Sequence, residues 1–125
     1  MAIAIQGVDH IMITVGDLDI AKDFYESVLG LQEADCPVKD GMRVWYKLGN
    51  QELHVNLRRD FCAGKGHFAL SVKPEQYHQY YEQVKNSGYA KITESMHFSE
   101  DNHHRFYLDD PFGNFIEVID GSICA

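Results

Sequence analysis

Two copies of one pattern of hydrophobic and polar residues organise the chain. Residues 8–15 alternate between two faces, which predicts a strand on which His10 lies beside Met12. Residues 66–72 repeat the pattern, and when His67 is aligned with His10 the apolar positions that follow coincide. Because internal repetition decides the architecture, we interpret the chain as one unit used twice.

Each of these strands is followed by a segment with the apolar spacing of a helix. The first predicted helix begins after an N-cap, Asp17, and ends at Gly30. The second has Pro74 at its first position and ends at Gly88. Aromatic pairs on both helices are expected to pack against a sheet: Phe24 with Tyr25, and Tyr80 with Tyr81.

Each half is completed by three further predicted strands. In the first half these are residues 31–37, 42–48 and 51–57. In the second they are residues 90–94, 104–108 and 115–119, with a polar loop at 96–103 and a tight turn at 109–114. Residues 58–65 are interpreted as the connection between the halves.

The length of 125 residues is that of one domain. A half of about 60 residues would bury too little surface to be stable alone, so the two halves should pack on each other. We therefore expect a single α+β domain over residues 1–125, with modules at about residues 7–58 and 66–120.

Composition restricts the cellular context. No apolar run approaches the roughly 18 residues that span a bilayer, and the first residues lack the basic start of a signal peptide, which favours a cytoplasmic protein that does not enter membranes. Cys36, Cys62 and Cys124 are odd in number and scattered, which indicates free thiols. A net charge of −8 argues against nucleic-acid binding, although local arginines could still attract a small anion.

The repetition also aligns residues that could bind a metal ion. His10 corresponds to His67, and alignment of the final strands of the two halves sets His54 opposite Glu117. Modules packed about a pseudo-twofold axis would bring these four donors to one locus. Imidazole and carboxylate without thiolate favour zinc, nickel, cobalt, manganese or ferrous iron. Glu52 is the alternative to His54, because both lie on one face of the same strand.

The remaining histidines have simpler interpretations. His103 and His104 are adjacent, so on a strand they should point to opposite faces and cannot both serve one site. His78 is expected on the surface of the second helix, and His97 in the polar loop.

Four segments together resemble the vicinal oxygen chelate superfamily, over about residues 8–118: the first strand with Asp9-His10-Ile11, the helix Ala21–Tyr25 before Leu29-Gly30-Leu31, the strand Gly66–Ala69, and Asp110–Glu117. This superfamily includes glyoxalase I, methylmalonyl-CoA epimerase, extradiol dioxygenases, fosfomycin-resistance transferases and bleomycin-binding proteins. The resemblance implies paired βαβββ modules that form a cup-like mixed sheet around a metal site, with the helices outside.

The resemblance also implies which residues hold the metal. His10, His54, His67 and Glu117 match the four ligand positions, although relatives commonly have Glu or Gln where this chain has His54. The metal would chelate neighbouring oxygens of a small-molecule substrate, and Glu117 or Glu52 would take a proton. In a dioxygenase, His10, His67 and Glu117 would hold ferrous iron.

A glyoxalase-like lyase or isomerase is the function that the resemblance favours. The alternatives are an extradiol-type dioxygenase and a non-catalytic protein that binds a drug or toxin. Fosfomycin transferases match less well, because their basic antibiotic-binding residues have no clear counterpart here. Substrate contacts are expected from Arg43, Trp45, Arg105 and Tyr107. Relatives commonly form homodimers, so the site could form within one chain or across two.

Overall fold

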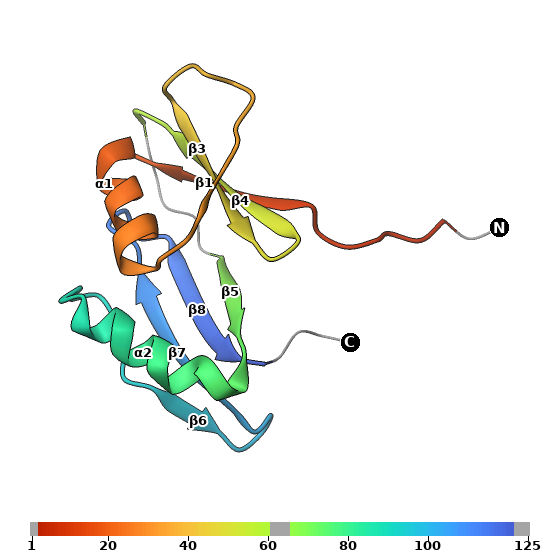
Figure 1. The fold of residues 1–125 in the computed structure, drawn as a ribbon, viewed down its shortest axis with the longest axis vertical. Helices are drawn as coiled ribbons and strands as arrows, with labels where there is room; N and C mark the ends of the chain where they lie inside the picture. Colours follow the sequence, from red (N-terminus) through yellow and green to blue (C-terminus); the bar gives the residue numbers. More distant parts are fainter. Residues whose placement is uncertain (1–2, 61–65, 122–125) are drawn as a thin grey trace.

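The chain runs twice through one strand, one helix and three strands (Figure 1). The computed structural model describes residues 3–60 and 66–121. The first half contains β1 (His10–Val15), α1 (Leu18–Lys22) with its π-helical continuation η1 (Asp23–Val28), β2 (Glu33–Ala34), β3 (Arg43–Leu48) and β4 (Gln51–Leu57). The second contains β5 (His67–Val72), a 3-10 turn η2 (Pro74–Gln76), α2 (Tyr77–Asn86), β6 (Met96–Phe98), β7 (His103–Asp109) and β8 (Phe115–Asp120).

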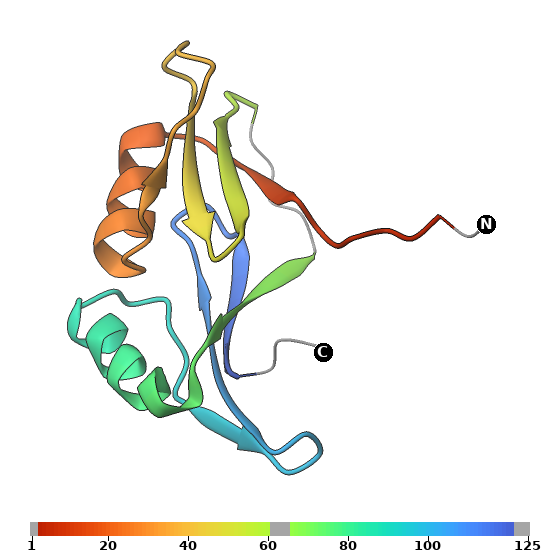
Figure 2. The same cartoon turned by 45° about the vertical axis from the view of Figure 1, so that its right-hand side comes forward.

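The strands form two four-stranded mixed sheets, in the orders β1-β4-β3-β2 and β5-β8-β7-β6. In each sheet the first strand pairs in parallel with the last, and the other pairs are antiparallel. Both helices lie on one side of the curved sheets and leave the other side open, as Figure 2 shows. We call that side the open face. The expected α+β architecture of two βαβββ modules is confirmed.

The strand register supports the alignment of the two halves. His10 lies opposite Glu52 across the β1–β4 pair, and His67 lies opposite Phe115 across the β5–β8 pair. Two residues further along, His54 and Glu117 take equivalent places in their sheets. The second half therefore has an aromatic ring, Phe115, where the first half has Glu52.

Local signals fix the helix ends. The Asp17 carboxylate accepts a hydrogen bond from the Ile20 amide at 2.9 Å, which confirms Asp17 as the N-cap. Gly30 and Gly88 have φ angles of 73° and 82°, the left-handed conformation that glycine adopts freely after a helix. Pro74 opens the 3-10 turn before α2 instead of the α-helix itself.

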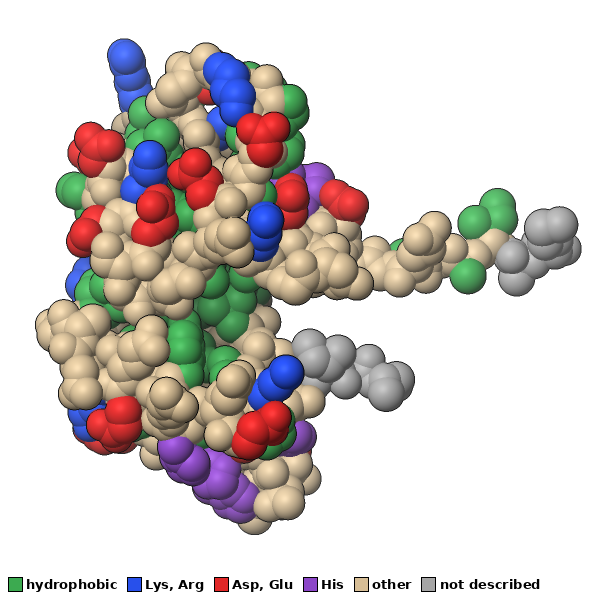
Figure 3. Space-filling view, viewed as in Figure 1, with side chains coloured by type: hydrophobic (Ala, Val, Ile, Leu, Met, Phe, Trp, Pro, Cys, Tyr) green, Lys and Arg blue, Asp and Glu red, His purple; other side chains and the backbone are tan. Residues whose placement is uncertain are grey.

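A single hydrophobic core contains residues of both halves. The predicted aromatic side chains lie in it: Phe24 and Tyr25 are almost fully buried, and the ring of Phe24 contacts that of Tyr89 at 4.8 Å. The Tyr80 hydroxyl donates to the Leu29 carbonyl in the first half. Figure 3 shows hydrophobic atoms along the seam where the two halves meet.

The turn between β7 and β8 ties the halves together. Asp110 has no exposed surface, and one of its oxygens accepts from the amides of Phe112 and Asn114. Its other oxygen accepts from the Tyr25 hydroxyl at 2.8 Å and from the Asn114 side-chain amide, which also donates to the Thr14 carbonyl. The turn thus has the structural role that its composition predicts.

Two predictions for the second half are wrong. Residues 90–94 are not a strand: they form one isolated bridge, Ile92 to Leu108, beside β7. Residues 96–103 are not a loop throughout, because Met96–Phe98 forms β6 and pairs with β7. Strand β6 is only three residues long and is followed by a polar turn with Asn102 at φ 59°, so the alternation of Met96, His97 and Phe98 is too short to predict a strand.

Three expectations concern residues at the limits of the description. Cys36 is a buried free thiol, as predicted, whereas Cys62 and Cys124 lie outside the described residues. Most of the connecting segment, residues 61–65, lies outside them too. Within residues 3–60 and 66–121, no helix has the length and apolar character needed to cross a membrane.

Candidate metal site

The first module presents its candidate donors on the open face of β1 and β4. The His54 ring is stacked between the rings of Trp45 and His10. The distance between ring centroids is 3.7 Å to Trp45 and 4.1 Å to His10. His54 Nε2 lies 2.9 Å from Glu52 Oε1. His10 Nδ1 lies 2.9 Å from a carboxylate oxygen of Asp9, which leaves His10 Nε2 as the nitrogen that can bind a ligand.

The second module presents His67 and Glu117 on β5 and β8. His67 Nε2 lies 3.3 Å from Glu117 Oε1, and the other Glu117 oxygen accepts from Arg105 at 3.2 Å. Glu117 is 7% exposed, whereas His67 is exposed to solvent. The pair therefore combines one fixed carboxylate with one accessible imidazole.

The spacing of His67 and Glu117 fits two ligands of one ion. Two ligand atoms bound about 2.1 Å from one metal ion lie roughly 3.0–3.4 Å apart when the ligand–metal–ligand angle is between a right angle and the tetrahedral angle. The observed 3.3 Å between nitrogen and oxygen lies in this interval. The residue types also suit a borderline divalent cation.

One chain does not bring the four predicted ligands together. His10 contacts His54, and His67 contacts Glu117. Within the described parts of the chain, however, no three His, Cys, Asp or Glu side chains come together as a metal site. Each module thus supplies its own pair of donors, and the two pairs remain separate.

Two of the four predicted substrate contacts, Trp45 and Tyr107, lie beside donors in the register. Trp45 is the β3 neighbour of His54, and Tyr107 is the β7 neighbour of Glu117. Tyr107 stacks on Phe115 with ring centroids 5.3 Å apart, so each donor pair has an aromatic wall. Both predicted arginines already have acidic partners: Arg43 donates to Asp40, and Arg105 to Glu117 and Asp101.

Comparison with known proteins identifies the family. The model of the glyoxalase/bleomycin resistance protein/dioxygenase superfamily matches residues 7–118. The chain belongs to this superfamily. Its sequence is 23% identical to metallothiol transferase FosB of Shouchella clausii (strain KSM-K16) over 125 residues, covering 95% of this chain and 83% of the relative.

Two solved structures of the superfamily resemble the chain. A glyoxalase family protein of Bacillus anthracis has 30% identity and a TM-score of 0.82, covering 96% of this chain and 98% of its own. The E126Q variant of the fosfomycin resistance protein FosX of Listeria monocytogenes, in complex with Mn(II) and 1S,2S-dihydroxypropylphosphonic acid, has 16% identity and a TM-score of 0.75. It covers 96% of this chain and 94% of its own, and at that identity it supports the fold alone.

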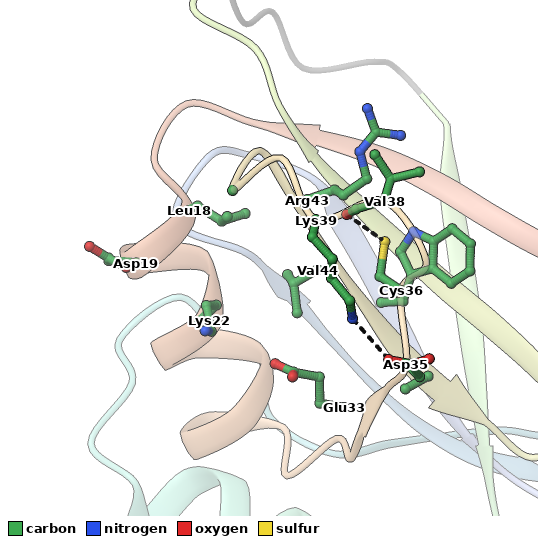
Figure 4. A pocket seen from close by; sticks show the side chains of 13 residues that line it. Leu18, Asp19, Lys22, Glu33, Asp35, Cys36, Val38, Lys39, Arg43 and Val44 are labelled. Carbon is green, nitrogen blue, oxygen red and sulfur yellow. Dashed lines mark hydrogen bonds and ion pairs between the residues drawn. The ribbon is translucent and has the colours of Figure 1, made fainter.

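Two surface hollows of this superfamily member are formed by residues other than the four predicted ligands. One hollow of about 580 Å³ separates α1 from the β2–β3 loop and borders Arg43 and Trp45. Figure 4 shows its loop wall, where Lys39 bonds Asp35 and the Cys36 thiol donates to the Val38 carbonyl. A second hollow, of about 690 Å³, lies between the modules. None of the four predicted ligands lines either hollow.

Sequence reasoning missed a histidine cluster at the far end of the second module, partly visible in the lower part of Figure 3. His103 and His104 do serve one group: their Nδ1 atoms lie 2.7 and 3.2 Å from the two oxygens of Asp120. The prediction that they cannot both serve one site is wrong, because Asp120 at the end of β8 lies next to the first residues of β7 and offers one oxygen to each histidine. The rings of His78 and His97 contact that of His104.

The Asp120 contacts shift the acidity of this cluster. The hydrogen bond with Asp120 holds the pKa of His103 above its ordinary value. For Asp120, burial acts to raise the pKa, but the hydrogen bonds from His103 and His104 outweigh burial and lower the pKa below its ordinary value. The adjacent His-His pair next to a strand was the sequence signal for this arrangement.

Proposed function

We propose that the protein is a divalent-metal enzyme that acts on a small molecule through two neighbouring oxygens, as a lyase or isomerase of the glyoxalase type. The observation that carries this proposal is the spacing of His67 Nε2 and Glu117 Oε1, 3.3 Å apart on the open face. The metal ion, when bound, supplies Lewis-acid stabilisation of an oxyanion on the substrate.

The proposed site forms between two copies of the chain. His10, supported by His54, would join His67 and Glu117 of a second copy in a homodimer. This arrangement is supported by the division of donors within one chain, where no three of them meet among the described residues. It also uses the open faces of both modules, which the helices leave uncovered.

The two glutamates have different proposed roles. Both oxygens of Glu117 have partners, His67 and Arg105, so Glu117 is assigned the role of a metal ligand. Glu52 bonds His54 through one oxygen, and its side chain is 39% exposed. Its second oxygen can accept a proton from a substrate beside the metal, and His54 holds the carboxylate in place.

Metal binding is the first test. We expect about one divalent ion per chain after expression in supplemented medium, and its loss in His67→Ala. Trp45 is the one tryptophan in the chain and stacks on His54, which contacts His10, so its fluorescence should change as a metal ion is added. A metal-free protein with unaltered Trp45 emission would instead support the non-catalytic binding protein.

Mixing two inactive variants tests the site between chains. His10→Ala and His67→Ala each destroy every site in their own homodimers. In randomly mixed dimers, about a quarter of all sites regain both residues, because half of the dimers are mixed and each has one intact site. Recovered metal binding and activity near that fraction are the expected result, and no recovery contradicts a site made by two chains.

A second candidate is a metal-dependent thiol transferase. It is favoured by the similarity to FosB, named a metallothiol transferase, across 95% of this chain. The assay compares hemithioacetal turnover, loss of fosfomycin with and without a thiol, and oxygen consumption with ferrous iron and a catechol. Turnover of the hemithioacetal alone is expected; oxygen consumption would point to the dioxygenase.

A further inference from the structure

Arg105 is held on three sides on the open face. Its Nη1 donates to Glu117 Oε2 at 3.2 Å, and its Nη2 donates to Asp101. The guanidinium carbon lies 4.4 Å from the centre of the Phe98 ring, within the range of a cation–π contact. Arg105 is 8% exposed, so it has little surface left with which to meet a substrate.

The two carboxylate oxygens of Glu117 have different partners. Oε1 faces His67, and Oε2 is bound by Arg105. Resting on the proposed metal function, we infer that Arg105 is a positioning residue that restricts Glu117 to one-oxygen metal binding and is not a substrate contact. This role differs from the substrate contact that the sequence predicts for Arg105.

A positioning residue such as Arg105 keeps a coordination position of the metal ion open. A carboxylate that binds through both oxygens occupies two positions on the ion, and one of these would otherwise be open to substrate. The planar arginine fork fixes the orientation of the carboxylate, because its bonds to Glu117 and Asp101 hold the guanidinium itself in place. Arg105 also balances the charge of a carboxylate that is buried from water.

The internal duplication supplies a matched control. Arg43 is paired with Asn56 in the first sheet as Arg105 is paired with Ile119 in the second, so the two arginines are equivalent in register. Arg43, however, donates to Asp40 near the chain turn. The residue in the place of Glu117 is His54, which bonds Glu52 instead.

The test titrates wild type, Arg105→Met, Arg105→Lys and Arg43→Met with Mn(II) alone and follows free Mn(II) by electron paramagnetic resonance. Loss of a group that orients a metal ligand costs about 10–100-fold in affinity, which is the expected effect of Arg105→Met. Arg105→Lys keeps the charge but not the fork, so we expect an intermediate loss. Arg43→Met should bind Mn(II) as wild type does.

Crystal structures of the metal-free variants give a second readout. In Arg105→Met we expect the distance between Glu117 Oε1 and His67 Nε2 to exceed about 4 Å, the limit of an ion pair. In Arg43→Met we expect this distance to be the same as in the wild type. If Arg105→Met does not fold, Asp101→Asn frees one side of the guanidinium at a partly exposed position, and it should weaken Mn(II) binding by a smaller factor.

The inference is overturned if Arg105→Met binds Mn(II) with unchanged affinity. Asp101→Asn takes its place in this comparison if Arg105→Met does not fold. An undisturbed Glu117 in the variant crystals also overturns the inference. A wild-type protein that binds no divalent ion has a different meaning. It refutes the proposed function, while the position of Glu117 in the metal-free crystals still decides whether Arg105 orients it.

Discussion

The hydrogen bond between Tyr25 and Asp110 should control the stability of both modules at once. The Tyr25 hydroxyl of η1 lies 2.8 Å from Asp110 Oδ2 in the β7–β8 turn, 85 residues away in sequence, and both residues are fully buried. Burial, and next the charge of Asp110, raise the pKa of Tyr25 far above its ordinary value, so the hydroxyl remains a donor at any working pH.

Tyr25→Phe removes one of the four hydrogen bonds to Asp110 and leaves the ring in the core. A buried hydrogen bond to a carboxylate contributes about 1.5–3 kcal/mol, and we expect a loss of about 2 kcal/mol because three donors remain. For a chain of this length, that loss corresponds to a fall in Tm of roughly 5–10 °C.

Urea unfolding at neutral pH measures this loss, and Tyr46→Phe is the matched control. Tyr46 is also fully buried, but its hydroxyl donates to the exposed Glu26 within the first module. We expect a cost of about 1 kcal/mol there. Trp45 fluorescence should report the first module, and amide signals of β7 and β8 the second.

The two probes should report one shared transition, which shifts as a whole in Tyr25→Phe, because the modules are predicted to be one domain. A Tyr25→Phe cost no greater than that of Tyr46→Phe would refute the reasoning. Separate transitions in the wild type would refute it too, because the modules would then unfold independently.

Two further changes test local contacts. Asp17→Ala removes the acceptor for the Ile20 amide and should cost about 1 kcal/mol in urea unfolding. The pKa of His103 is raised in the folded state by Asp120, so this pair stabilises the fold below the unfolded pKa of His103 and loses that effect as pH rises through the folded pKa. His103→Gln should therefore lower Tm more at about pH 5.5 than at about pH 8.5, and an equal loss at both values would contradict the pairing.

Sequence alone was sufficient for features that repeat or that depend on near neighbours. The alignment of His54 with Glu117 follows from the repeat and is matched by the strand register. The N-cap role of Asp17 depends on residues within one turn. Strand β6 was not predictable, because its three residues are too few to establish an alternation and the strand depends on its pairing with β7.

The grouping of the donors depends on a different kind of information. Parallel pairing within each module fixes which residue stands beside which, so the contacts His10–His54 and His67–Glu117 are consequences of a repeated local pattern. The orientation of one module against the other depends instead on single long-range contacts such as Tyr25 with Asp110, which no periodicity reveals. A repeated sequence therefore predicts two equivalent half-sites, but it cannot predict whether a half-site is completed by its own chain or by a second copy.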